Sequence, residues 1–229
     1  MKKSFKKKGL FIIIPVYNEG PVIEQVLKDV QKIIDCKIIV VDDGSTDQTH
    51  SLLENKKIIL LRHFINRGKG AAVSTGINAA LKLGAEYAIT MDGDGQHDPK
   101  DVENIMNKLK KGFDVVLGYR KFSSKDIPLV KKMHNSFANV LIFFLYNIWV
   151  KDSQSGFRGY SKKALLFLDA NTDRYEFDSK VLRDVKKNNL KFAEIPVKVY
   201  YTDYSRNKNN KQTFLNGIRT LYKILISLW

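Results

Sequence analysis

The sequence predicts an α/β fold in which a mostly parallel central sheet is flanked by helices. Short apolar segments alternate with longer segments whose apolar residues recur at helical spacing, which is typical of strands joined by crossover helices. The first apolar segment, residues 10–16, has no charged residue, as expected for a parallel strand buried on both faces. Acidic and polar residues gather directly after several of these segments, where open α/β sheets bind their ligands.

Residues 10–61 predict three strands and two helices. Strands are expected at the apolar segments 10–16, 37–41 and 58–61. Pro21 suits the first position of a helix, because the N–H that proline lacks has no helical partner there. Apolar residues then follow on one helical face, at Val22, Val26, Val30 and Ile33. Residues 45–47 offer caps for a second, short helix.

Residues 68–118 predict two more helices and two more strands. Residues 68–83 are rich in small residues and predict a helix, and residues 87–91 predict the fourth strand. Asp98 and Pro99 mark the next helix, as its cap and its first residue. The inward face of that helix is expected to carry Val102, Ile105, Met106 and Leu109. The fifth strand is expected at residues 115–118.

The character of the chain changes after residue 120. Helices are expected over residues 127–150, 161–169, 178–188 and 214–229, and a strand over residues 192–201. Residues 154–160 are expected to be irregular, and residues 202–211 to form a polar loop. No internal repeat and no long linker is visible, so one domain is the simplest prediction.

The net charge of +15 is concentrated in the second half of the chain. Residues 1–120 contain 19 Lys and Arg against 15 Asp and Glu, a balance of +4, which leaves +11 for residues 121–229. Such a charge favours a polyanionic partner, either nucleic acid, anionic lipid headgroups or a phosphorylated substrate. Five lysines among the first eight residues predict a flexible basic tail over residues 1–9, with a membrane-surface contact as the alternative.

Cysteine usage and hydropathy indicate the compartment. Cys36 is the one cysteine, which excludes an internal disulfide and fits a reducing compartment. No signal peptide is recognisable, and the longest apolar stretches, residues 140–146 and 148–150, fall short of the roughly 20 residues that span a bilayer. The chain is therefore not expected to cross a membrane by itself.

Asp92 and Asp94 follow the fourth predicted strand in an Asp-Gly-Asp motif. Two hard oxygen ligands one residue apart suit Mg²⁺ or Mn²⁺, and such an ion usually binds substrate phosphates as well. A solvated turn is the alternative, because such pairs occur by chance in many chains. A calcium-binding EF-hand is excluded, because His97 stands where that loop requires glycine.

Three more predicted strands end in polar residues at the same edge of the sheet. They contribute Tyr17 and Glu19, then Asp42 and Asp43, and finally Arg120. Packing or capping can explain each residue singly, but together an aromatic ring, carboxylates and an arginine predict a ligand-binding crevice. Neither G-x-G-x-x-G after the first strand nor G-x-x-x-x-G-K-[ST] occurs, so neither a dinucleotide site nor a Walker ATPase is supported.

These segments together resemble glycosyltransferase family 2, the inverting enzymes with the GT-A nucleotide-sugar-binding fold. The matching segments are residues 15–19, 40–47, 66–76 and 91–99. In the second half, residues 152–160, 175–178 and 194–197 resemble the dolichyl-phosphate mannosyltransferase and polyprenyl-phosphate glycosyltransferase branch. The resemblance implies one GT-A domain over residues 10–229, with a donor half at 10–120 and an acceptor half at 121–229.

The resemblance also implies roles for single residues. The nucleoside end of a sugar-nucleotide donor would be held by Pro15, Tyr17, Glu19, Val41 and Asp43. The donor diphosphate and its ion would be held by Asp92, Gly93, Asp94 and Gln96. Of these, Asp92, Asp94 and Gln96 would bind the Mg²⁺ or Mn²⁺, which would neutralise charge on the leaving nucleoside diphosphate. Arg120 would contact the donor and, with Asp92 and Asp94, would be catalytic.

The implied acceptor is a polyprenyl or dolichyl phosphate at an anionic membrane surface. The second pKa of such a phosphate is near ~6, so at pH 7 it is largely a dianion that needs no general base. Cations that could bring the two anions together are Arg120, Arg158, Arg206, Lys208 and Lys211, with Arg158, Arg206 and Lys211 assigned to the acceptor phosphate. GDP-mannose is the first donor expected and UDP-glucose the second. The enzyme would be peripheral on the cytoplasmic face of a membrane, with a membrane-anchoring subunit as a candidate partner.

Two rival interpretations remain open. Transfer to a sugar hydroxyl would need a carboxylate base, and the Gln-x-x-Arg-Trp signature of processive enzymes is absent because Gly159 follows Arg158. A protein that binds nucleic acid or anionic membranes would explain the basic charge. It gives no reason for acidic residues at the ends of two strands, so nucleic acid is not expected as a partner.

Overall fold

A computed structural model describes residues 5–120, 139–140, 142–168, 177–200 and 204. Seven strands within these residues form one sheet in the spatial order β3-β2-β1-β4-β6-β5-β7. Their bounds are β1 (Phe5–Val16), β2 (Ile34–Asp42), β3 (Ile59–Arg62), β4 (Tyr87–Thr90), β5 (Val115–Arg120), β6 (Arg158–Ser161) and β7 (Phe192–Val197). All run in one direction except β6, which is antiparallel to its neighbours β4 and β5. The predicted mostly parallel sheet is therefore confirmed.

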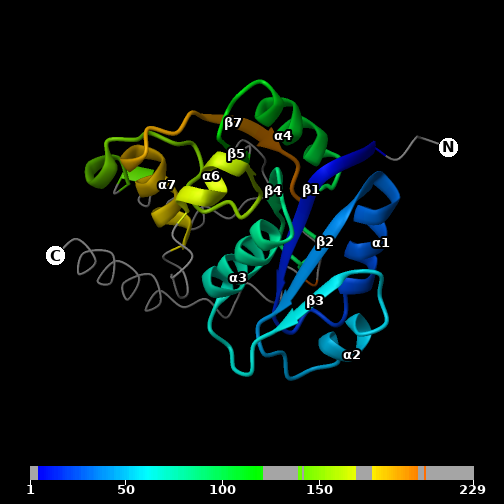
Figure 1. The fold of residues 1–229 in the computed structure, drawn as a ribbon. Coiled ribbons are helices and arrows are strands. Elements are labelled where there is room, and N and C mark those ends of the chain that lie inside the picture. The colour runs from blue at the N-terminus through cyan, green and yellow to red at the C-terminus, as the bar shows by residue number, and fades with distance from the viewer. Residues whose placement is uncertain (1–4, 121–138, 141, 169–176, 201–203, 205–229) are drawn as a thin grey trace.

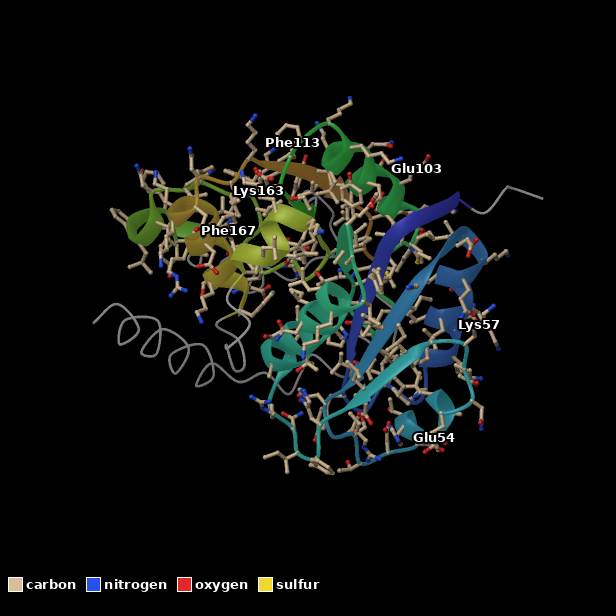
Figure 2. The ribbon with its side chains drawn as sticks, viewed as in Figure 1. Glu54, Lys57, Glu103, Phe113, Lys163 and Phe167 are labelled. Atoms are coloured by element: carbon tan, nitrogen blue, oxygen red, sulfur yellow. The ribbon has the colours of Figure 1, made fainter. Side chains whose placement is uncertain are left out.

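Helices cover both faces of this sheet (Figure 1). They are α1 (Ile23–Ile33), α2 (Thr49–Leu53), α3 (Lys69–Lys82), α4 (Asp101–Lys110), α6 (Lys162–Phe167) and α7 (Phe177–Lys187). Helices α1, α2 and α4 bury their apolar residues against one face, and α3, α6 and α7 against the other. Charged side chains such as Glu54, Lys57 and Glu103 point outward from the layers (Figure 2).

The alternation along β1 explains why both faces are covered. Leu10 and Ile12 belong to the core under α1 and α4, whereas Phe11 and Ile13 belong to the core under α3. All four are at most 1% exposed, as expected for a central parallel strand. Helix α3 approaches β1 closely because Gly76 faces the side chain of Ile13, where a Cβ would collide. This close packing brings the first turn of α3 to the carboxyl edge of the sheet.

The five strands predicted in the first half are confirmed, with shifts at their ends. Strand β2 begins at Ile34 rather than at residue 37, directly after α1. This longer β2 gives β1 a partner further upstream, so that Phe5 and Lys6 pair with Ile34 and Asp35. The flexible tail predicted for residues 1–9 is therefore wrong for residues 5–9, which lie in β1.

Strand β6 is missing from the sequence prediction, which made residues 154–160 irregular. Its four residues include Arg158 and Gly159, so no apolar run marks it. It forms because β4 and β5 leave a gap in which both can pair with it. Gly159 is required there, since a Cβ would collide with Ile105 of α4.

The other predictions for the second half are confirmed in part. The helix expected over residues 127–150 is described only from residue 139, and residues 139–140 and 142–146 are helical. It ends at Asn147, whose φ is +51°, so residues 148–150 are not helical. Strand β7 ends at Val197 rather than at residue 201. Residues 202–211, apart from Tyr204, and residues 214–229 lie outside the described residues.

In the described part of the chain, no helix combines the length and the apolar character that crossing a bilayer requires.

Candidate active site at the carboxyl end of the sheet

The carboxyl ends of β1, β2 and β4 meet at one edge, as the sequence predicted. The three strands are parallel neighbours, with β1 in the middle. Two backbone bonds join them beyond their ends: Asp43 N–H donates to Val16 O at 2.8 Å, and Met91 N–H donates to Ile13 O at 2.9 Å. The polar segments that follow the three strands are therefore held side by side.

The Asp92–Asp94 turn lies directly over the end of β1. A Cβ on Gly93 would come within 2.6 Å of the Val16 side chain and 3.2 Å of Pro15 O, so only glycine allows this approach. The turn is closed by a bond from Gln96 N–H to Asp94 Oδ1 at 3.0 Å. This local geometry orients the Asp94 carboxylate, while Gly93 fixes the height of the turn above the sheet.

Asp92 is held from two sides. The Lys69 ammonium at the start of α3 lies 2.6 Å from Asp92 Oδ1, and the Asp92 N–H donates to His97 Nδ1 at 3.2 Å. Burial alone would raise the pKa of Asp92, but the charge and hydrogen bond of Lys69, together with His97 and Arg120, outweigh burial, and the pKa lies below its usual value. Asp92 is therefore ionised at neutral pH.

The pKa of Asp94 is shifted in the opposite direction, upward. Burial raises the pKa of its carboxyl, and the negative charge of Asp92 raises it further. A carboxyl group whose pKa is raised by a neighbouring carboxylate belongs to a site that a cation would stabilise. Within the described residues, no cluster of three or more His, Cys, Asp or Glu could hold a metal by itself. The pair fits an ion that also takes substrate phosphates and water as ligands, which is typical of Mg²⁺.

His97 is a site residue that sequence reasoning did not find. Its ring stacks on Phe157 with centroids 4.8 Å apart and an interplanar angle of 22°. Burial lowers the pKa of His97, against the attraction of Asp92 and Asp94. Because its Nδ1 accepts the Asp92 N–H, the ring is neutral and fixes the backbone at Asp92. A histidine five residues after an aspartate is too common a spacing to have marked this contact.

Arg120, at the end of β5, is oriented by a buried carboxylate. Its Nε donates to Asp152 Oδ2 at 2.7 Å and its Nη2 donates to Asp152 Oδ1 at 2.9 Å. The Asp152 side chain is fully buried, whereas that of Arg120 is 23% exposed. The charge of Arg120 also contributes to lowering the pKa of Asp92, less than Lys69 and His97 do and against the effect of burial. The role of Arg120 in donor binding stays a prediction.

The structure does not support Arg158 as a contact for the acceptor phosphate. Arg158 is 1% exposed. Its guanidinium donates to three carbonyl oxygens, those of Ser155 at 2.8 Å, Asp178 at 3.0 Å and Ser153 at 2.6 Å. It also pairs with the Asp178 carboxylate at 3.2 Å. The prediction is corrected because β6 turns Arg158 inward, where it joins the loop before β6 to the start of α7.

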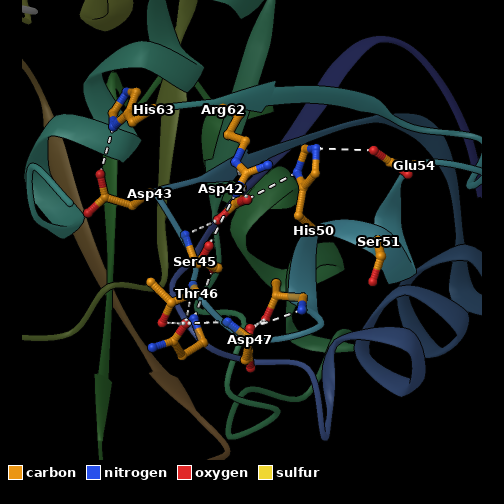
Figure 3. A network of polar contacts seen from close by, with 12 residues as sticks. Asp42, Asp43, Ser45, Thr46, Asp47, His50, Ser51, Glu54, Arg62 and His63 are labelled. Carbon is orange, nitrogen blue, oxygen red and sulfur yellow. Dashed lines mark hydrogen bonds and ion pairs between the residues drawn. The ribbon is translucent and has the colours of Figure 1, made fainter. Parts of the chain in front are cut away.

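On the donor side, Asp43 holds a loop. Its Oδ1 accepts the Arg67 N–H at 3.0 Å and its Oδ2 accepts the Gly68 N–H at 2.7 Å. Figure 3 shows the third contact, in which His63 Nδ1 lies 2.6 Å from Asp43 Oδ1. These bonds set the loop that leads into α3 and so position Lys69. A direct contact of Asp43 with the donor stays a prediction.

Asp42 anchors the neighbouring turn. Its Oδ1 accepts the Ser45 N–H at 2.8 Å, and His50 and Arg62 lie 3.1 and 3.4 Å from its Oδ2 (Figure 3). The carboxylate is fully buried, so these groups hold the turn after β2 in place.

Pro15, Tyr17 and Val41 differ in what they can offer a donor. Val41 is fully buried in the core under α3, so only its backbone can face a donor, and its contact with the nucleoside stays a prediction. Pro15 is also buried and offers the site only its backbone beside Gly93. Tyr17 is 39% exposed just beyond β1, and its role at the base stays a prediction.

Glu19 connects the donor side to the end of the described chain. Tyr204 donates through its hydroxyl to Glu19 Oε2 at 2.9 Å and to Asn18 O at 3.0 Å. Upstream, Tyr200 N–H donates to Gln96 O at 2.8 Å. The segment after β7 thus contacts both the end of β1 and the turn after Asp94. Arg206, Lys208 and Lys211 continue this segment but lie outside the described residues.

Comparisons with known proteins agree with this architecture. The family model "Glycosyl transferase family 2" matches residues 11–167. A UDP-N-acetylglucosamine–dolichyl-phosphate N-acetylglucosaminyltransferase of Methanococcus voltae is 35% identical, over 96% of this chain and 96% of the relative. A dolichyl-phosphate beta-glucosyltransferase of Dictyostelium discoideum is 30% identical, over 96% of this chain and 76% of the relative.

A solved structure shows the same fold at lower identity. Glucosyl-3-phosphoglycerate synthase of Mycobacterium tuberculosis, crystallised with Mn²⁺, UDP and phosphoglyceric acid, superposes with a TM-score of 0.67 and 17% identity. The match covers 87% of this chain and 73% of that one. The seven-stranded sheet is thus the GT-A fold. With the family match over most of the sheet and its carboxyl edge, the chain belongs to glycosyl transferase family 2 and is a glycosyltransferase.

Proposed function

We propose that this glycosyltransferase moves one hexose from a sugar nucleotide to a polyprenyl or dolichyl phosphate, with inversion at the anomeric carbon. The observation that carries the proposal is the pair Asp92 and Asp94 over the end of β1, held by Lys69 and His97. Relatives that match nearly the whole chain have names that give a dolichyl phosphate as acceptor. The acidic residues at the carboxyl edge of the sheet suit a cation that binds the donor diphosphate. The basic charge of residues 121–229 suits an anionic acceptor.

UDP-N-acetylglucosamine is the donor that the relatives favour. It stands in the name of the Methanococcus voltae relative, and a glucosyl donor is implied for the Dictyostelium enzyme. The first expectation from the sequence, GDP-mannose, remains a competitor because no described contact reads the base. Tyr17 and Glu19 are the residues proposed to meet the nucleoside, one as a half-exposed ring and the other as a hydrogen-bond acceptor.

A divalent ion, Mg²⁺ or Mn²⁺, is proposed at Asp92 and Asp94, with Gln96 as the third predicted ligand. When bound, such an ion neutralises charge on a leaving diphosphate. The chain's own part is to keep Asp92 ionised through Lys69 and to fix its backbone through His97. The bond from Gln96 N–H fixes Asp94 beside it.

The reaction proposed needs no general base from the protein. A phosphate oxygen of the acceptor attacks the anomeric carbon, the bond from that carbon to the diphosphate breaks, and the electron pair leaves with the nucleoside diphosphate. Arg120 is proposed to attract the anionic groups, because Asp152 holds its guanidinium in a fixed orientation at the end of β5. Arg206 and Lys211 remain proposed partners of the acceptor phosphate.

The enzyme is proposed to work at the cytoplasmic face of a membrane, as a peripheral protein with or without an anchoring subunit. Aromatic residues near residue 145 support this location. Phe144 is 79% and Trp149 60% exposed, and both rings contact Phe143, at centroid distances of 6.0 and 5.9 Å. Exposed aromatic rings beside basic residues are typical of surfaces that enter the lipid interface.

A donor screen tests the proposal. The purified chain would be given polyprenyl phosphate in detergent, Mg²⁺ or Mn²⁺, and radiolabelled UDP-N-acetylglucosamine, UDP-glucose or GDP-mannose. We expect one donor to transfer label into the organic phase, and EDTA to prevent it. Asp94→Asn should lower the rate by about a hundredfold or more. The substitution removes a carboxylate proposed to bind the ion that neutralises the charge of the leaving diphosphate.

The possible outcomes separate the parts of the proposal. Metal-dependent nucleotide binding without labelled lipid would keep the donor site and move the acceptor elsewhere. Labelled lipid that survives EDTA would contradict the proposed ion. No binding of any sugar nucleotide would contradict the assignment of the acidic edge to the donor.

A further inference from the structure

The ammonium of Lys69 lies inside the acidic edge rather than on the surface around it. Lys69 is the first residue of α3 and follows Gly68, whose φ is +97°. Its Nζ lies 2.6 Å from Asp92 Oδ1. On the opposite side stands Gly156, where a Cβ would come within 2.6 Å of Asp92 Oδ1 and would also collide with the ammonium. The ion pair therefore packs against the Gly156 backbone on one side, while the Lys69 side chain stays 36% and the Asp92 side chain 25% exposed.

A second carboxylate, that of Asp178, lies near Lys69. Lys69 and Asp178 line the same small pocket, of about 20 Å³, together with Thr90, Gly156 and Tyr160. The Lys69 ammonium therefore has two carboxylates near it, that of Asp92 in a direct ion pair and that of Asp178 in the lining of the same pocket.

We propose that Lys69 is a built-in counter-cation that competes with the divalent ion for Asp92 and so sets the metal affinity of the free enzyme. The inference rests on the proposed function, because it concerns the ion proposed at Asp92 and Asp94. A carboxylate oxygen paired with an ammonium must weaken that contact before it can bind a metal ion strongly. A Lys69 ammonium displaced from Asp92 would still lie near the Asp178 carboxylate, which lines the same pocket and also pairs with Arg158.

This role differs from simple positioning. If Lys69 only held the Asp92 carboxylate in place, its removal would disorder a metal ligand and weaken metal binding. If Lys69 competes, its removal frees the same oxygen and takes away a repelling positive charge, so metal binding becomes tighter. The two roles therefore predict opposite changes in metal affinity.

The test measures Mn²⁺ binding to the full chain without nucleotide, by electron paramagnetic resonance or calorimetry. Lys69→Met should bind Mn²⁺ about tenfold more tightly or better than the unchanged chain. Lys69→Arg keeps the charge and should stay within about threefold of it. Lys163→Met is the matched control, and its Mn²⁺ affinity should equal that of the unchanged chain. Lys163 is 55% exposed and pairs with Asp114, just before β5 and away from the acidic residues (Figure 2). Asp94→Asn should lose binding, which would locate the ion.

Several results would decide against the proposal. Equal or weaker Mn²⁺ binding by Lys69→Met, in a variant whose circular dichroism shows a folded chain, would overturn it. If Lys69→Met does not fold, looser binding by Lys69→Gln would overturn it in the same way. If neither the unchanged chain nor any variant binds Mn²⁺, with or without UDP, there is no ion at Asp92 and Asp94. That result would contradict the proposed function itself, not only the role of Lys69.

Discussion

Asp92 and Asp94 are chemically unequal, although one glycine separates them. Lys69, together with His97 and Arg120, overcomes the effect of burial on the pKa of Asp92, whereas burial and the charge of Asp92 together raise the pKa of Asp94. One carboxylate is thus compensated inside the protein and the other is left to be compensated by a ligand. This difference explains how two partly buried acidic residues can lie side by side and leave one carboxyl group for the proposed cation.

Arg158 is expected to act on stability and not on the acceptor. Because its guanidinium is buried and pairs with Asp178, Arg158→Met should lower the free energy of unfolding by about 3 kcal/mol or more, measured by urea denaturation. Arg183→Met, which removes an arginine that is 32% exposed, should cost less than about 1 kcal/mol. A stable Arg158→Met protein with a raised KM for polyprenyl phosphate would restore the original prediction for Arg158.

At the residue scale, the sequence predicts the local motif but not the groups that surround it. Asp92 and Asp94 are recognisable because they stand one residue apart and follow an apolar strand. Lys69, His97 and Asp152 reach the site from a helix start, a turn and a loop, through contacts that only the folded chain creates. Lys69 stands in a Gly-Lys-Gly motif at residues 68–70, which is too short for a phosphate-binding loop. The motif by itself therefore does not predict that Lys69 reaches Asp92.

Among the elements, the connection into β6 lies directly against the turn that carries Asp92. Thr90 at the end of β4 donates through its hydroxyl to Gly156 O at 2.7 Å, which fixes that connection against the acidic turn. The absence of a side chain at Gly156 then leaves space for the Lys69–Asp92 pair. The short antiparallel strand β6 is therefore part of the site's geometry.

Gly156→Ala tests this element directly. The added Cβ would meet Asp92 Oδ1 at 2.6 Å, so we expect the variant to lose about a hundredfold in transfer rate while keeping its circular dichroism spectrum. Gly84→Ala is the matched control, because nothing lies within 4 Å of a Cβ there, and its cost in stability comes from a φ of +79° alone. Equal activity of the two variants would show that Gly156 does not shape the site.

The predictability of the elements follows their chemistry. Strands β1 to β5 lie in apolar runs, and α1 and α4 carry regular apolar faces, so both kinds of element could be predicted from the sequence. The start of β1 at Phe5 and the whole of β6 could not, because their residues are not distinctly apolar and they form only where a neighbouring strand offers a free edge.

For the whole molecule, the uneven charge and the exposed aromatic residues predict how it meets a membrane. Phe144→Ser combined with Trp149→Ser should reduce flotation with anionic vesicles by about tenfold, because each ring is more than half exposed. Phe64→Ser is the control, since Phe64 is fully exposed in the loop after β3. Unchanged flotation of the double variant, with a steep dependence on salt, would assign binding to the basic residues alone.

Global stability should decline in alkali. Burial raises the pKa of Tyr160 to about 12, whereas in an unfolded chain tyrosine ionises near about 10. Between these values the unfolded chain releases a proton that the folded chain keeps, so stability falls as the pH rises. Tyr160→Phe should remove about 1.4 kcal/mol of the loss between pH 8 and pH 11, measured by urea denaturation. Some loss should remain, because burial also raises the pKa of Cys36 to about 12.

The central claim is that the acceptor's own phosphate is the nucleophile, and acceptor chemistry tests it most directly. With the active donor supplied, the lipid product would be analysed by mass spectrometry after reaction with polyprenyl phosphate or with the matching polyprenol. The account predicts that polyprenyl phosphate gains the mass of one sugar residue, that polyprenol gains nothing, and that Asp94→Asn forms almost no product. Transfer to polyprenol, or to a free sugar in preference to the lipid phosphate, would contradict it.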